Sequence, residues 1–225
     1  MFYDTFIIRV CDNAIRRKIL EETFMATKQY SCVKRTKKAF EESLVQLSNE
    51  LPLNKITVKM LCERAELSRN AFYFHYSDIN ALIDDIENSV VGEVEQLLRE
   101  LEDIGIPKNV YASVSGIIDI FDARKETCVM LFDKTSNDIT VRLSELFCNF
   151  YYKYFREFHS TDDRVNYDFF YMFLSNGFYG LLRYWFNNYD KMSRNEVTAL
   201  AYVLVKRLMV PKNPEINFVA MKEDT

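Results

Sequence analysis

Residues 57–76 of the chain read TVKMLCERAELSRNAFYFHY. This stretch divides into a short helix, a tight turn over residues 65–67 and a second helix. Thr57 and Ser68 precede the two helices, where a side-chain oxygen accepts a hydrogen bond from a free backbone N–H. Small and medium apolar residues, including Cys62 as a packing residue rather than a reactive thiol, let the two helices cross closely. The pattern predicts a helix-turn-helix.

The second helix has two different faces. At 100° per residue, Phe72 and Tyr76 share one face, which the rest of the domain must cover. The opposite face holds Asn70 and Phe74. Polar residues alone would fit an ordinary solvated helix, but an exposed Phe74 beside Tyr73 is unfavourable on a plain surface. We therefore interpret the outer face as one that enters the major groove of double-stranded DNA.

The residue types on this face suggest separate roles. Asn70 could pair with adenine and Arg69 with guanine, and Phe74 could contact a thymine methyl group. Other polar side chains would bind phosphate, which fixes the register without reading sequence. The predicted DNA-binding residues are Thr57, Lys59, Arg69, Asn70, Ala71, Tyr73, Phe74 and His75.

Several short motifs carry a resemblance to a known family. They are Ile56-Thr57-Val58, Ala65-x-Leu67-Ser68, Phe72-Tyr73-x-His75-Tyr76 and Leu82. With them, the span from Val33 to Ile86 resembles the amino-terminal domain of the TetR family of transcriptional regulators. The resemblance implies a three-helix DNA-binding domain, a helical ligand-binding domain and a homodimer, usually a repressor released by a small molecule. Two positions depart from the family pattern: Glu66 replaces the usual glycine of the turn, and Ile79 replaces a lysine.

The composition fits a helical DNA-binding protein. Only 5 glycines and 4 prolines occur in 225 residues, which favours an all-α chain with few joints. The formal charge of -4 is uneven, with a net +3 over residues 1–80 and a net -7 over residues 81–225. Phosphates would therefore dock at the amino-terminal end.

Other compositional features exclude several classes of protein. No run approaches the roughly 20 apolar residues needed to cross a bilayer, so no membrane association is expected. Asp4 and the absence of a basic start argue against a secretory signal. The 5 cysteines lack any CxxC pair, which predicts neither a disulfide framework nor a metal site. We expect a cytoplasmic protein without a cofactor.

Helical periodicity and breakers predict the domain organisation. Helices are expected at residues 33–50, from Asp78 to about 104, and at 109–123, 124–133, 138–159, 165–188 and 193–210. Ser193 and Glu196 have the spacing of a capping box. The predicted domains are an amino-terminal extension (1–32), the helix-turn-helix domain (33–80), a regulatory and dimerisation domain (81–210) and a tail (211–225). Met25 is the expected native start, with a genuine amino-terminal helix from Met1 as the alternative.

Aromatic residues crowd the region from Phe147 to Trp185. Stripes of this kind are often plain core, but they also suit a pocket for a small-molecule effector. The predicted ligand contacts are Phe147, Tyr151, Tyr154, Phe173 and Tyr179.

The same region contains glycines within a predicted helix. Each glycine lowers helix stability by nearly 1 kcal/mol relative to alanine, so another interaction should offset this loss. Close approach of a partner helix in a dimer would supply it. The predicted interface residues are Ser175, Gly177, Gly180, Tyr184, Leu200 and Leu204. This segment loosely resembles a TetR subgroup that includes the regulator of dihydroxyacetone kinase operons.

An enzyme is the main alternative from another class. The chain has only 2 histidines and no phosphate loop, nucleophile motif or metal-ligand spacing, so no catalysis is expected. The preferred hypothesis is a homodimeric repressor that binds a near-palindromic operator. A co-regulator or activator controlled by a protein partner is the other hypothesis that the sequence allows.

Overall fold

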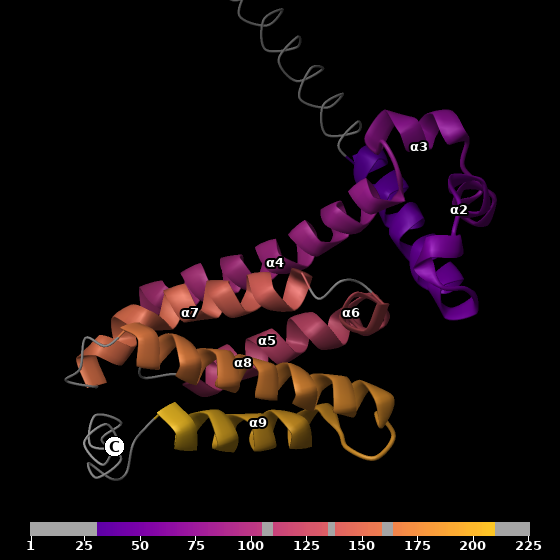
Figure 1. Ribbon diagram of the computed structural model, residues 1–225. Coiled ribbons are helices and arrows are strands. Elements are labelled where there is room, and N and C mark those ends of the chain that lie inside the picture. Colours follow the sequence, from indigo (N-terminus) through magenta and orange to yellow (C-terminus); the bar gives the residue numbers. More distant parts are fainter. Residues whose placement is uncertain (1–30, 105–109, 135–137, 159–163, 210–225) are drawn as a thin grey trace, which may run out of the picture. The chain divides into compact units, whose positions relative to one another are not determined.

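The computed structural model describes residues 31–104, 110–134, 138–158 and 164–209 (Figure 1). These residues form helices joined by short connections, with no strand among them, so the predicted all-α fold is confirmed. The chain divides into two compact units, Met1–Leu82 and Ile83–Thr225. The predicted extension (1–32, apart from its last two residues) and tail (211–225) lie outside the described residues, as does the question of Met25.

The first unit contains the predicted helix-turn-helix. Helix 31–50 is followed by a short 3-10 helix η1 (Leu53–Lys55), α2 (Val58–Ala65) and α3 (Arg69–His75). The first helix ends at residue 50, as predicted, whereas η1 was not anticipated. The first turn of α4 (Ile79–Ile104) completes the unit.

Local hydrogen bonds set the helix starts of this unit. The Thr57 hydroxyl accepts from the Met60 N–H at 3.3 Å, and the Ser68 hydroxyl accepts from the Ala71 N–H at 3.1 Å. Both predicted caps are therefore confirmed. Asp78 caps α4 in the same way, its carboxylate accepting from the Ala81 N–H at 2.9 Å.

Glu66 ends α2 in the left-handed conformation, with φ 54° and ψ 37°. Its backbone N–H bonds back to the carbonyl oxygens of the helix end. Glycine adopts this conformation without strain, whereas a residue with a Cβ is destabilised by roughly 1 kcal/mol. The departure from glycine seen in the sequence is thus a real local strain in the turn.

The second unit is a helical bundle. It comprises the rest of α4 with α5 (Val110–Ala123), α6 (Lys125–Lys134), α7 (Asp138–Phe158), α8 (Arg164–Asn187) and α9 (Arg194–Met209). All of these bounds lie within one residue of the prediction. Helix α7 packs on α8, and α5 packs on α9. The predicted capping box at the start of α9 is present, with the Ser193 N–H donating to Glu196 at 2.8 Å.

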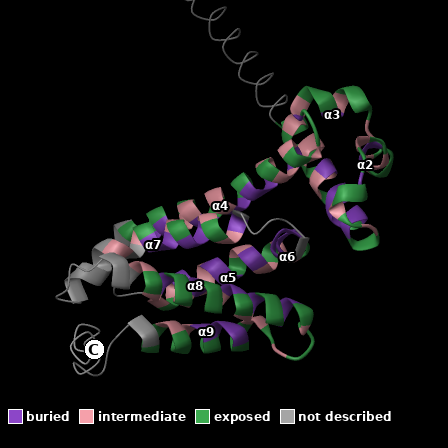
Figure 2. Cartoon of the chain, viewed as in Figure 1, coloured by how far each residue is buried: buried purple, intermediate pink, exposed green. Residues whose placement is uncertain are grey.

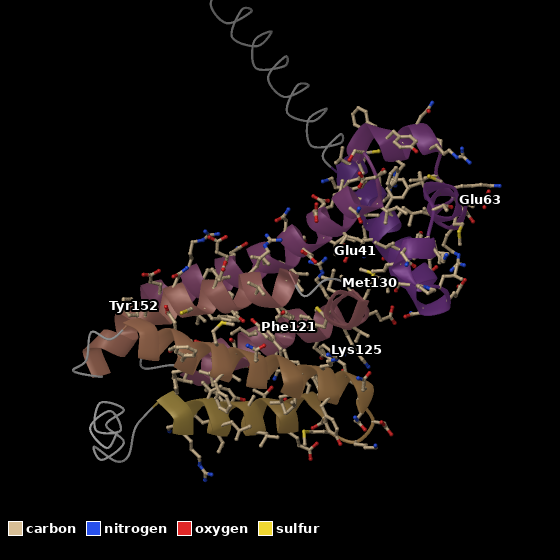
Figure 3. The ribbon with its side chains drawn as sticks, viewed as in Figure 1. Glu41, Glu63, Phe121, Lys125, Met130 and Tyr152 are labelled. Carbon is tan, nitrogen blue, oxygen red and sulfur yellow. The ribbon has the colours of Figure 1, made fainter. Side chains whose placement is uncertain are left out.

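Buried residues line the inner sides of these helices (Figure 2). Phe121 of α5 and Met130 of α6, both labelled in Figure 3, are almost fully buried, as is Trp185 of α8. The Trp185 indole N–H donates to the Met192 carbonyl at 2.7 Å, which fixes the turn between α8 and α9. In the described parts of the chain, no helix is both long and apolar enough to span a membrane.

Candidate nucleic-acid interface and ligand cavity

The inner face of α3 is anchored in an aromatic core. Phe72 is fully buried and Tyr76 nearly so, as the helical-face argument predicted. The Phe72 ring meets the ring of Phe40, from helix 31–50, edge to face at 5.3 Å, and it lies 5.6 Å from the ring of Tyr76. Edge-to-face packing of this kind is favourable beyond area burial. It fixes the rotation of α3 about its axis.

The outer face of α3 is consequently presented to solvent. Tyr73 is 59% exposed and Phe74 is 77% exposed. Arg69 and Asn70 are also exposed, whereas Ala71 and His75 are half-buried. The Phe74 and His75 rings meet edge to face at 4.9 Å between centroids. The predicted inward and outward facing of α3 is confirmed, and its contacts with DNA stay a prediction.

Two further predicted phosphate-binding residues lie at the start of α2. Thr57 is exposed, although its hydroxyl already caps the helix. The Lys59 ammonium lies 3.8 Å from the Glu63 carboxylate, and both side chains are largely exposed (Figure 3 labels Glu63). Exposed pairs of this spacing contribute only about 0.3–0.5 kcal/mol, so the pair leaves Lys59 able to exchange its carboxylate for a phosphate.

Arg64 holds α2 against the end of helix 31–50. Its guanidinium donates to both carboxylate oxygens of Glu50, at 2.8 and 2.9 Å, and this lowers the pKa of the Glu50 carboxyl. A bidentate pair is geometrically specific. Burial raises the pKa of the neighbouring Cys62 thiol, which agrees with a packing role for this residue.

A cavity of about 60 Å³ lies between α5, α7, α8 and α9 of the second unit. Its walls are almost entirely apolar, and no charged side chain contributes to them. The residues that line it are Val114, Ile117, Phe147, Tyr171, Leu174, Ser175, Phe178 and Val205.

Next to this cavity lies a buried tyrosine hydroxyl. Tyr179 follows Ser175 by one helical turn on α8, and its side chain is buried against the ring of Phe132. Its hydroxyl makes no hydrogen bond to any described residue, although the Ser144 hydroxyl is close. Ser144 itself donates to the Thr140 carbonyl at 2.7 Å. Burial raises the pKa of the Tyr179 phenol far above its usual range, opposed in small part by Ser144.

The predicted ligand residues are only partly gathered here. Phe147 lines the cavity, and Tyr179 lies one turn beyond it. Phe173 does not line the cavity, because it is 71% exposed on α8, and its contact with a ligand stays a prediction. The side chains of Tyr151 and Tyr154 lie outside the described residues. Aromatic content pointed to α7 and α8 but gave no signal for the aliphatic walls that α5 and α9 provide.

An apolar surface covers the outer sides of α8 and α9. Its large side chains are 39 to 74% exposed. They are Phe169, Met172, Phe173, Tyr184, Leu200, Val203 and Leu204. We call this surface the α8–α9 face. A Cβ placed on Gly177 or Gly180, both exposed, would meet nothing within 4 Å.

One predicted interface residue does not belong to this face. Ser175 is buried on the cavity side of α8, where its hydroxyl donates to the Tyr171 carbonyl at 2.7 Å. The prediction for Ser175 was therefore wrong, because the 3.6-residue period turns position 175 inward while positions 177 and 180 turn outward. Gly177, Gly180, Tyr184, Leu200 and Leu204 are exposed, and their contact with a partner stays a prediction.

Known proteins resemble this chain in sequence and in fold. Residues 108–207 match the family model TetR_C_8, the transcriptional regulator C-terminal region. A search of curated proteins finds no sequence that matches the chain.

Solved structures share the fold at low sequence identity. The fatty acid degradation regulator FadR from Bacillus halodurans has a TM-score of 0.62 at 10% identity, covering 79% of this chain and 96% of its own. NalD of Pseudomonas aeruginosa is the secondary repressor of the MexAB-OprM multidrug efflux pump. It has a TM-score of 0.60 at 15% sequence identity, covering 80% of this chain and 98% of its own. A TetR transcriptional regulator from Streptococcus agalactiae 2603V has a TM-score of 0.53 at 22% sequence identity, and it also covers 80% of this chain and 98% of its own.

These findings agree with the helix-turn-helix of the first unit and with the helical bundle of the second. The matched family model and the solved structures named above are those of transcriptional regulators, not enzymes. Residues 108–207 are thus similar to the carboxyl-terminal region of TetR-type transcriptional regulators, and the described residues share the fold of the solved regulators named above.

Proposed function

We propose that this protein is a homodimeric repressor that reads a near-palindromic operator through α3 and is released by a small apolar molecule. One observation carries the proposal: the aromatic core fixes α3 so that Tyr73 and Phe74 face solvent at 59% and 77% exposure. Large aromatic side chains are seldom held outward on a rigid helix without a partner. NalD, which shares the fold, is a repressor, and we extend that mode of regulation to this chain.

The chemistry of α3 divides into reading and positioning. Asn70 carries an amide that can donate to adenine N7 and accept from the N6 amino group, and Arg69 carries paired donors that suit guanine O6 and N7. Each such contact is worth about 1–3 kcal/mol of discrimination. Phe74 offers an apolar edge to a thymine methyl group. Tyr73 and Lys59 supply a hydroxyl and an ammonium for phosphates, so they add affinity without sequence preference.

The α8–α9 face supports dimerisation. It is a set of large exposed apolar side chains on two helices that pack on each other, and these helices would form a four-helix contact with a second copy. Gly177 and Gly180 are consistent with a close approach of the partner helix, because nothing within the chain itself requires glycine there. A two-fold dimer presents two α3 helices to successive major grooves about 34 Å apart, which makes the operator near-palindromic.

The cavity defines the class of effector. Its walls carry no charged side chain, so an ionised ligand would lose hydration without compensation. Ligand pockets usually measure about 300–1,000 Å³, whereas this one has about 60 Å³ of free space. An effector must therefore be uncharged where it enters the cavity, and it must push α5, α7, α8 and α9 apart to enter.

Ion pairs inside the second unit link that displacement to α4. Arg142 of α7 donates to Asn88 at 2.6 Å and lies 3.6 Å from the Glu87 carboxylate, which is buried. A buried carboxylate resists loss of its partner, since removal of one member leaves an uncompensated charge. When α7 moves, α4 is therefore drawn with it. Helix α4 starts directly after the recognition helix, and its displacement would change the spacing of the two α3 helices.

Operator binding tests the proposal. Purified protein is mixed with fragments of the DNA that flanks its own gene, and bound fragments are sequenced after selection at about 0.1 M salt. A near-palindromic site is expected, with Asn70→Ala relaxing preference at one base pair and Tyr73→Phe weakening binding to all sequences alike. Equal effects of both changes on every sequence would contradict the division of roles. Specific binding that requires an added protein partner would overturn the repressor in favour of a co-regulator.

A library of small apolar compounds then tests release. We expect uncharged compounds to lower operator affinity and to protect the second unit against thermal unfolding, whereas charged analogues of the same size do neither. Release by ionised compounds alone would contradict the apolar cavity as the effector site.

A further inference from the structure

Residues 34–38 read KRTKK and form a dense basic segment at the start of the first described helix. Lys34, Arg35 and Lys38 are exposed, and Lys37 is half-buried. An ion pair joins Lys38 to Glu42 at 3.6 Å, with both side chains more than half exposed. Clustered exposed cations on one side of a nucleic-acid-binding unit are the usual footprint of phosphates.

The segment lies beside the carboxyl-terminal end of the recognition helix. The Lys37 ammonium is 5.5 Å from the centre of the Tyr76 ring, and Tyr76 is the residue that caps the carboxyl-terminal end of α3. A cation held against an aromatic face is attracted by the ring and has less freedom to lose on binding. The amine is thus positioned next to α3 before any DNA arrives.

Apart from His75 in its last turn, that end of α3 has no basic residue of its own. Residues 76–80 read YSDIN, without lysine or arginine, and Asp78 adds a carboxylate that caps α4. The other end of α3 begins with the exposed Arg69. A helix in the major groove meets phosphates along both of its flanks, so neutralisation on the carboxyl-terminal flank must come from another element.

We infer that residues 34–38 are a second phosphate-binding element, which binds the DNA backbone on the flank of α3 that lacks lysine and arginine. The inference rests on the proposed insertion of α3 into the major groove. Duplex DNA is the occupant because the segment adjoins the recognition helix and carries the opposite charge. The contact is with the sugar-phosphate backbone, so it strengthens binding to operator and to random sequence equally.

Salt titration measures this phosphate binding directly. The probe is a random-sequence 30-base-pair duplex, and binding is followed by fluorescence anisotropy from about 0.05 to 0.2 M salt. Removing one phosphate-binding cation lowers the slope of log K against log salt by about 0.9, which corresponds to about eightfold weaker binding at 0.1 M. We expect that reduction for Lys37→Met and about twice the change in slope for the double variant Lys34→Gln with Arg35→Gln. Lys34 and Arg35 are both exposed, so the double variant should fold normally. It therefore tests the inference even if Lys37→Met proves unstable.

The matched control is Lys55→Met, which makes the same charge change in the same unit. Lys55 is exposed and follows the opposite end of helix 31–50, and about 20 Å of helix separates Lys37 from Glu50. Screening over about 10 Å at 0.1 M salt leaves only a weak long-range effect there, so its slope should not change. Adding a cation to the deficient flank with Ile79→Lys should restore most of the affinity that Lys37→Met removes.

Four results would overturn the inference. Equal reductions of the slope for Lys55→Met and the segment variants would mean a diffuse effect of net charge. Unchanged slopes in the segment variants, with the wild type binding normally, would refute this element while leaving the proposed function intact; a wild type that binds no duplex would refute both. Binding to phosphatidylglycerol vesicles that Lys34→Gln with Arg35→Gln abolishes, with DNA affinity unchanged, would assign the segment to a membrane surface instead.

Discussion

Replacing Gly177 and Gly180 by alanine separates two contributions to stability that act in opposite directions. Within one chain, a Cβ at either position meets nothing within 4 Å. Alanine in a helix interior is favoured over glycine by roughly 0.5–1 kcal/mol. The isolated subunit should therefore become more stable, by about 1–2 kcal/mol for the double variant if the two effects add.

In the proposed dimer, the same methyl groups would enter a close helix contact. Overpacking of an ordered contact costs about 1–3 kcal/mol, and two-fold symmetry presents every substitution twice. We expect the double variant to lose about 3 kcal/mol of dimerisation free energy. This loss raises the dimer dissociation constant by roughly a hundredfold. The subunit gains stability while the dimer loses it.

Two measurements and one control variant make this test specific. Sedimentation velocity over a concentration series gives the dissociation constant, and urea unfolding below that constant gives the stability of the subunit. Gly92→Ala in α4 is the matched control, because a Cβ there also meets nothing within 4 Å and the residue lies in the helix interior. We expect Gly92→Ala to stabilise the subunit without changing dimerisation.

If all three alanines raised stability and none weakened the dimer, the proposed close contact of α8 with its partner would be refuted. Gly177 and Gly180 would then have no role in close packing. A protein that is monomeric at every concentration would remove the dimer itself from the proposal.

Three smaller predictions test local features. Tyr179→Phe removes a buried hydroxyl that bonds to no described residue, so urea unfolding should give a free energy higher by about 1 kcal/mol; a decrease of that size would mean that the hydroxyl is satisfied. Glu66→Gly relieves the left-handed strain at φ 54° and should raise stability by up to about 1 kcal/mol, which a fall in melting temperature would disprove. Hydrogen bonds from Ser193 lower the pKa of Glu196, so the stabilisation is present at neutral pH and disappears as the pH falls through the lowered value; Glu196→Gln should flatten the acid side of the stability profile, and an unchanged profile would count against it.

The sequence predicted local features well because local rules determine them. Thr57, Ser68 and Ser193 begin helices as cap chemistry requires, and the rotation of α3 followed from the 3.6-residue period applied to Phe72 and Tyr76. Neither result needs knowledge of distant residues. Both depend on side chains that lie within a few positions of each other.

The cavity was harder to predict because it depends on tertiary packing. Val114 of α5 and Val205 of α9 line it, and such aliphatic residues look identical to ordinary core in the sequence. Phe173 and Phe147 look alike in the sequence, since both lie in the aromatic-rich region, but Phe173 points to solvent. Both faces of α8 carry apolar residues, so the helical pattern does not show which face is buried. Aromatic content cannot distinguish a pocket wall from an intersubunit face when a helix carries both.

That double use of α8 connects dimerisation with effector binding. Tyr171, Leu174, Ser175 and Phe178 face the cavity, while Phe173 and its neighbours form the exposed side of the same helix. A ligand that widens the cavity must therefore displace or rotate the helix that holds the dimer together. If the α8–α9 face joins two subunits, the effector and dimer sites are coupled through one rigid element, and effector affinity must depend on protein concentration. Effector binding measured below and above the dimer dissociation constant should differ, and equal affinities would show that α8 transmits nothing between them.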